Sequence, residues 1–225
     1  MWKTGLAVLL LPTVALAQEQ PRRYVEGGIF LSEAKPVLVV QIENRFEYLG
    51  NDEFVLKEAA SVDRHHWVDI EDGRVQALIV FQFEGLLEGV DGQYQFDIPE
   101  ELAGSNYRFS PQLVKFGDHE FVHNTWAFDN AASAKSDPEA ESARTLEFLK
   151  SKGYEMDDEL IMSRHVTAVG EDTRDELILF YMEPLSAHGR SLHDFPDGGP
   201  PSAEFDAVSD LVTERGRQAI RFPSD

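Results

Sequence analysis

Residues 119–123 read H-E-F-V-H, which has the residue types and spacing of the zinc-peptidase motif H-E-x-x-H. On a helix, the four-residue step places both imidazoles on one face toward a metal ion, and the glutamate can activate the metal-bound water. The flanking sequence indicates a strand instead, because a Gly-Asp turn precedes it and both flanks are rich in strand-forming residues. In a strand, residues four apart lie about 13 Å from each other, too far to bind one metal. We therefore expect no metal site. The alternative is a metal-dependent hydrolase that uses His119, Glu120 and His123.

Two Arg-His pairs, Arg64-His65 and Arg164-His165, form the second candidate site. Two guanidiniums that face a common groove would suit a dicarboxylate or another anionic ligand, because each can form two parallel hydrogen bonds with a carboxylate. The simpler interpretation is that each arginine pairs with the Glu-Asp of its own hairpin as a structural fastener. Aromatic residues such as Trp126 can line a pocket for an apolar ligand, although core packing is their more common use. The candidate ligand-binding residues are therefore Arg64, His65, Arg164, His165 and Trp126.

Other kinds of catalytic site lack support in the sequence. The chain contains no cysteine, so a thiol nucleophile is excluded. It also has no G-x-S-x-G element and no glycine-rich phosphate loop. We expect no catalytic residue and no cofactor.

The stretch that carries the first Arg-His pair reappears in diverged form about a hundred residues later. Residues 64–86 match residues 164–185 when a gap of one residue is allowed. The match predicts an internal duplication of the fold. The identical pairs are Arg64/Arg164, His65/His165, Glu71/Glu171, Asp72/Asp172, Arg74/Arg174, Leu78/Leu177, Ile79/Ile178, Phe81/Phe180, Glu84/Glu183 and Leu86/Leu185.

Hydrophobic periodicity predicts the elements that position these residues. The spacing of Val39, Ile42, Phe46 and Leu49 favours a helix over residues 36–49, although a β-branched run at 37–40 favours a strand. A second helix is predicted over residues 137–153, where Asp-Pro can begin it and acids occupy the first turn. Strands are predicted at residues 24–31, 62–70, 75–84, 94–98, 107–116, 119–128, 160–169 and 176–183.

These elements predict an α+β fold, with two diverged strand-helix-strand-strand repeats around an antiparallel sheet. The repeats cover about residues 24–104 and 107–187 of a single domain at 18–201. Ser202 is a helix-capping residue, and the apolar side chains that follow it share one helical face. We therefore expect residues 202–225 to form a C-terminal helix, which packs on the sheet, and a tail.

The amino-acid composition limits the kinds of partner that the protein can bind. The chain has 225 residues, of which 41 are acidic and 20 basic, giving a net charge of −21. Nucleic-acid binding depends on Lys and Arg that displace phosphate counterions, so this balance argues against a nucleic-acid partner. No segment has the length and apolarity of a membrane span. A partner is expected to be a small molecule or another protein.

The N-terminal residues have the pattern of a secretory signal peptide. Lys3 precedes an apolar run, and residues 15–17 read Ala-Leu-Ala, which is typical of a cleavage site. We predict that residues 1–17 are removed and that the protein is periplasmic or secreted. The function that the sequence favours is non-enzymatic binding of a small molecule or a protein partner. A purely structural or assembly role is a third possibility.

Overall fold

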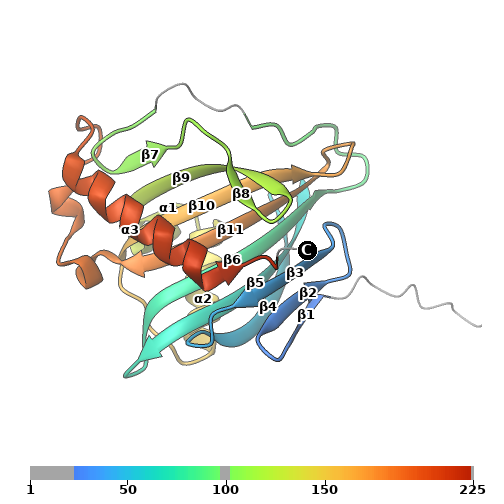
Figure 1. The fold of residues 1–225 in the computed structure, drawn as a ribbon, viewed down its shortest axis with the longest axis horizontal. Coiled ribbons are helices and arrows are strands. Elements are labelled where there is room, and N and C mark those ends of the chain that lie inside the picture. The colour runs from blue at the N-terminus through green and yellow to red at the C-terminus, as the bar shows by residue number, and fades with distance from the viewer. Residues whose placement is uncertain (1–22, 97–101, 224–225) are drawn as a thin grey trace, which may run out of the picture.

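The computed structural model describes residues 23–96 and 102–223 and consists mainly of two antiparallel sheets. The smaller sheet has the strand order β1-β2-β3-β12, and the larger has the order β4-β5-β6-β11-β10-β9-β7, with β8 paired to β9 (Figure 1). The strands are β1 (Arg23–Glu26), β2 (Ile29–Ser32), β3 (Leu38–Ile42), β4 (Glu47–Leu56), β5 (Ala60–Glu71), β6 (Arg74–Leu86), β7 (Tyr107–Phe109), β8 (Val114–Phe116), β9 (His119–Asp129), β10 (Glu159–Val169), β11 (Asp175–Pro184) and β12 (Ile220–Arg221).

The described residues also form three α-helices: α1 (Asn130–Ser136), α2 (Glu141–Ser151) and α3 (Ala203–Ala219). Two short 3₁₀ turns, Leu185–His188 and Leu192–Asp194, join β11 to α3. None of the helices in the described part of the chain is long and apolar enough to cross a membrane.

The larger sheet is buried on both faces. On one face the core contains residues from the small sheet and from α3, such as Phe30, which contacts Trp67 and Phe81, and Phe205, which contacts Phe195. On the other face Leu149 of α2 packs against apolar residues of the central strands. Burial on both faces explains why the central strands have nearly continuous apolar sequences instead of strict alternation.

The α+β prediction with strand-helix repeats is wrong, because the chain is mostly β structure. Residues 36–49, which we expected to be a helix, form β3 and the start of β4. Leu38, Val40 and Ile42 are buried while Val39 is 45% exposed, so burial alternates with a period of two. The β-branched run is thus consistent with the strand, because such side chains fit an extended, half-buried surface.

The predicted strand-helix-strand-strand repeat is absent, because β4 precedes the hairpin β5–β6 whereas α2 precedes the hairpin β10–β11. Strands β6 and β11 are neighbours, and Phe180 lies opposite Val80, whereas Phe81 lies opposite Leu179. The matched residues Phe81 and Phe180 thus belong to cores on opposite faces of the sheet. The alignment needs a gap of one residue, and in a strand a shift of one residue moves each following side chain to the other face.

Several local predictions are confirmed. The β5–β6 hairpin turns at Asp72 and Gly73, whose φ angles of 51° and 77° are those of a tight hairpin turn. Helix α2 lies within the predicted range but begins at Glu141, after Ala140, and not at the predicted Asp-Pro. Helix α3 begins after Ser202, whose hydroxyl accepts a hydrogen bond from the Phe205 amide. Gly216 allows α3 to approach the sheet closely, because a Cβ atom there would lie 3.0 Å from the Tyr181 Cβ atom.

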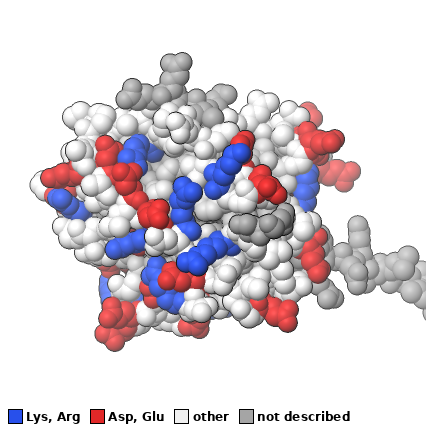
Figure 2. Space-filling model, in the orientation of Figure 1, with Lys and Arg blue, Asp and Glu red and all other residues white. Residues whose placement is uncertain are grey.

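Acidic and basic side chains are interleaved on the face that carries α3 (Figure 2). Arg108 pairs with Asp206 and Asp210 of that helix. Arg215 pairs with Glu183, which is itself buried. Part of the basic charge of this face is therefore neutralised within the protein.

Candidate functional site

A hollow of about 620 Å³ lies on the face of the larger sheet that α2 partly covers. A second hollow of about 200 Å³ adjoins it between the sheet, α1 and α2. The two share Trp126, Glu141, Met162 and Phe180 as lining residues. The larger hollow is lined in addition by Leu56, Glu84, Tyr107, Phe109, Asn124, Arg164, Glu176 and Ile178.

Strand pairing explains why these residues meet. Arg164 of β10 lies directly between Asn124 of β9 and Phe180 of β11, and cross-strand partners point to the same face of a sheet. Glu84 of β6 and Glu176 of β11 are cross-strand partners in the same way. Residues at two-residue steps along each strand therefore form the floor of the hollow.

Arg164 is half-buried at this floor, and its guanidinium forms no hydrogen bond or ion pair with any residue that the structure describes. Burial lowers the pKa of Arg164, and the nearby carboxyl groups of Glu176, Glu141 and Glu84 oppose that effect. A guanidinium remains charged in proteins and has five N–H donors. Arg164 is therefore a cation with unused donors in a hollow.

The carboxyl groups of the hollow form a cluster around Gln82. The Gln82 side-chain amide donates hydrogen bonds to Glu84 and to Glu141, and the Tyr94 hydroxyl donates to Glu84 at 3.2 Å. Burial and the neighbouring Glu84 raise the pKa of Glu176 to about 8. Glu176 is therefore protonated at neutral pH, because two adjacent buried carboxylates cannot both ionise at low cost.

Two buried side-chain oxygens at these hollows have no hydrogen-bond partner among the described residues. One is Oδ1 of Asn124, whose side chain is 5% exposed and lines the larger hollow. The other is Oε1 of Gln82, which is fully buried and lines the smaller one. An unpartnered buried polar atom costs about 1–3 kcal/mol, so these oxygens favour a ligand that donates hydrogen bonds.

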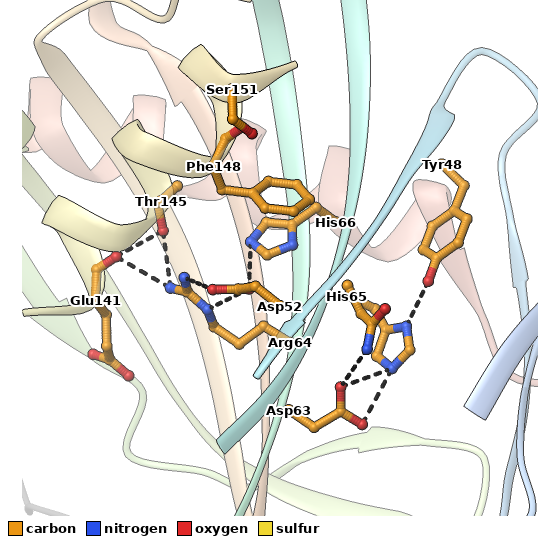
Figure 3. A network of polar contacts seen from close by, with 11 residues as sticks. Tyr48, Asp52, Asp63, Arg64, His65, His66, Glu141, Thr145, Phe148 and Ser151 are labelled. Atoms are coloured by element: carbon orange, nitrogen blue, oxygen red, sulfur yellow. Dashed lines mark hydrogen bonds and ion pairs between the residues drawn. The ribbon is translucent and has the colours of Figure 1, made fainter. Parts of the chain in front are cut away.

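Arg64 lies on the same face of the sheet, but its guanidinium already forms four hydrogen bonds within the protein (Figure 3). It donates two hydrogen bonds to Asp52, at 3.1 and 2.7 Å, and two to α2, at the Glu141 carbonyl and the Thr145 hydroxyl. The fastener interpretation therefore describes Arg64. Its partners come from β4 and α2, however, and not from the Glu-Asp of its own hairpin.

His66 is buried beside this network, stacked on Phe148 of α2 with a centroid distance of 4.2 Å (Figure 3). Burial, together with the positive charge of Arg64, lowers the pKa of His66 to about 3. The imidazole is therefore neutral near pH 7. It contributes packing beneath α2.

His65 points to the opposite face, away from the hollow. Its Nδ1 atom lies 2.8 Å from the Tyr48 hydroxyl, and its Nε2 atom lies 3.3 Å from Asp63 (Figure 3). Burial would raise the pKa of Asp63, but hydrogen bonds from His65 and Arg23 outweigh it and lower that pKa. The Tyr48 hydroxyl is not activated, since burial and Asp63 raise its pKa to about 12.

His165 also points away from the hollow and is stacked on His123, with a centroid distance of 4.4 Å. Burial lowers the pKa of His123 to about 4, helped by Arg108 and Arg217. Burial lowers the pKa of His165 well below its usual value, helped by His123. The His123 Nε2 atom lies 3.0 Å from the Ser163 hydroxyl.

The H-E-F-V-H segment lies on β9, as its flanks predicted. Glu120 is exposed and pairs with Lys115 at 3.0 Å, while His123 is buried against His165. His119 contacts the rings of Phe121 and Phe222. Among the described residues, no group of three or more His, Cys, Asp or Glu side chains is arranged to hold a metal ion.

The structure therefore divides the predicted ligand-binding residues. Arg164 and Trp126 line the larger hollow, and Arg64 and Trp126 line the smaller one, whereas His65 and His165 lie on the other face. Sequence reasoning missed Gln82, Asn124 and the carboxyl groups of Glu84, Glu141 and Glu176. A signal existed in Gln82-Phe83-Glu84, where two polar residues alternate with an apolar one directly after a buried strand sequence.

Comparisons with protein-family models, curated proteins and solved structures find no match to this chain.

Proposed function

We propose that the protein binds a small organic molecule in the hollow that Arg164 and Trp126 line. The observation that carries the proposal is the unpaired Arg164 guanidinium beside aromatic side chains. The volume of about 620 Å³ is in the range of small-molecule sites, which combine apolar walls with a few polar groups. Tyr107, Phe109 and Phe180 supply such walls. Binding alone accounts for these features, and no catalytic step is proposed.

The test uses the fluorescent dye 8-anilinonaphthalene-1-sulfonate, an aromatic anion suited to Arg164 and the aromatic walls. We expect saturable binding at one site, with quenching of Trp126, which is 46% exposed. Trp67 is buried in the core on the other face, so a Trp67→Phe variant should retain this quenching.

Two variants locate the dye. Arg164→Met should weaken binding at least fivefold, and Ile178→Trp should fill the hollow and abolish the quenching. Arg190→Met is the matched control, since Arg190 pairs with Glu204 away from the hollow and should bind the dye normally. Equal dye affinity in all three variants would reject the hollow as a binding site.

We also propose that the protein is exported and that its partner is not a nucleic acid. The sequence of residues 1–17, which lie outside the described part of the chain, supports export to the periplasm or beyond the cell. The net charge of −21 and the internal pairing of Arg108 and Arg215 support a partner other than nucleic acid. Mass spectrometry of the exported protein should find Gln18 as the first residue, and retention of residues 1–17 would contradict export by this route.

A further inference from the structure

The larger hollow has opposite charges at two places on its floor. One place holds the Arg164 guanidinium, and the other holds the three carboxyl groups of Glu84, Glu141 and Glu176. Along β11, Phe180 lies beside Arg164 and Glu176 lies beside Glu84. These two positions are four residues apart on one face, which corresponds to about 13 Å along the strand.

The carboxyl end holds three acidic side chains, Glu84, Glu141 and Glu176, while Arg164 is the one lysine or arginine among the described residues that lines the larger hollow. The donors that contact Glu84 and Glu141 there, Gln82 and Tyr94, are neutral and supply no counter-charge. An ammonium group would complete this end, because it would supply the counter-charge that the neutral donors lack.

The arginine end requires the opposite group. Arg164 has donors without a partner among the described residues, and a carboxylate can accept two parallel hydrogen bonds from a guanidinium. Asn124 is its direct cross-strand neighbour, and the Asn124 Oδ1 atom is buried and unpartnered. A peptide N–H next to a carboxylate would satisfy both side chains together.

We propose that the ligand is an organic zwitterion of about dipeptide size with an apolar or aromatic body. Its carboxylate binds Arg164, and its ammonium group binds the carboxyl cluster of Glu84, Glu141 and Glu176. A ligand with only one charge would leave either Arg164 or the carboxyl cluster without its counterpart. This inference rests on the proposed function and specifies the ligand class of the same site.

Binding should also release a proton. Glu176 is protonated before binding because burial and Glu84 raise its pKa to about 8, and a bound ammonium group favours the ionised form. The other charged groups facing it are Glu84 on β6, Glu141 on α2 and Arg164 on β10. The released proton distinguishes contact with Glu176 from simple apolar binding.

The experiment compares four forms of the dipeptide Phe-Phe by isothermal titration calorimetry at pH 6.5. The forms have both termini free, the amine acetylated, the carboxylate amidated, or both blocked. We expect the zwitterion to bind at least tenfold more tightly than each blocked form. Its titration in two buffers of different ionisation enthalpy should show proton release, which should be absent in Glu176→Gln.

Matched variants assign each end of the ligand. Arg164→Met should remove the preference for a free carboxylate and keep that for a free amine. Glu84→Gln should do the reverse, and Arg190→Met should leave both preferences unchanged. If the doubly blocked dipeptide binds as tightly as the zwitterion, or if only the dye binds, the zwitterion proposal is wrong while the binding function stands. If neither dye nor dipeptide binds, both proposals are rejected.

Discussion

The strands β5 and β10 carry the same Arg-His dipeptide, and the structure uses the two copies differently. In both, arginine points to the face with the hollows and histidine to the opposite core. Arg64 lies next to the edge strand β4, which supplies Asp52, and beneath α2, which supplies Thr145. Arg164 lies between Asn124 and Phe180, neither of which is an acid. Neighbouring strands therefore decide whether such an arginine is a fastener or is left free for a ligand.

The largest expected difference between the two copies is in stability. Arg64→Met would leave the Asp52 carboxylate and the polar groups of α2 without their donor, so the free energy of unfolding should fall by about 3 kcal/mol. Arg164→Met breaks no hydrogen bond to a described residue and should change it by less than about 1 kcal/mol. Urea denaturation followed by circular dichroism measures both. Equal losses would show that Arg164 is also a structural residue.

The stacked histidines beside the second copy, His123 and His165, should make the stability of the protein sensitive to acid. His65 has a carboxylate partner in Asp63, whereas His165 faces the imidazole of His123. The pKa of His123 is about 4 in the folded protein, below the unfolded value of about 6.5. The unfolded state therefore binds more protons as the pH falls from about 6.5 to 4, and stability is lost over that range.

His123→Gln should reduce this loss, by up to about 1.4 kcal/mol for each pH unit. Urea denaturation at pH 6.5, 5.5 and 4.5 measures the slope of stability against pH. His193→Gln, at an exposed position, is the control and should keep the wild-type slope. An unchanged slope in His123→Gln would mean that the stacked pair near β10 does not cause the acid sensitivity.

The smallest expected effect concerns Glu120, on the strand that pairs with β10. It is exposed, so Glu120→Gln should change the free energy of unfolding by less than about 0.5 kcal/mol. The purified protein should hold substoichiometric zinc after dialysis, as measured by atomic emission. One zinc per chain in the wild type that is lost in His119→Ala and His123→Ala would contradict this. It would show that a metal centre lies beside the second Arg-His pair.

Local features of this fold could be predicted from the sequence because local chemistry determines them. Asp72-Gly73 tolerates the positive φ angles of a tight hairpin turn, and Ser202 caps α3. For residues 36–49 the sequence could not distinguish a helix from a strand. Their apolar spacing fitted a helix, while their β-branched residues fitted a strand. Only the pairing of β3 with β2 and β12 decides between the two.

The candidate site depends on pairing between distant segments, so little of it could be predicted. Glu84 and Glu176 meet only because β6 pairs with β11, and no local pattern specifies that pairing or its register. Arg164 and Trp126 were found from their chemical types alone. The same reasoning selected His65 and His165, because a residue type does not show which face of a strand a side chain occupies.

The smaller sheet has a consequence for the order in which the protein can fold. Its last strand, β12, pairs with β3, so Ile220 lies beside Ile42 across almost the whole described chain. Contacts between such distant segments close large loops and form slowly. We expect the N-terminal strands to lack their final partner until the last residues have been synthesised. If the protein is exported as we propose, a fold that is completed only by β12 would leave the chain unfolded and able to pass through a narrow export channel until late in its synthesis.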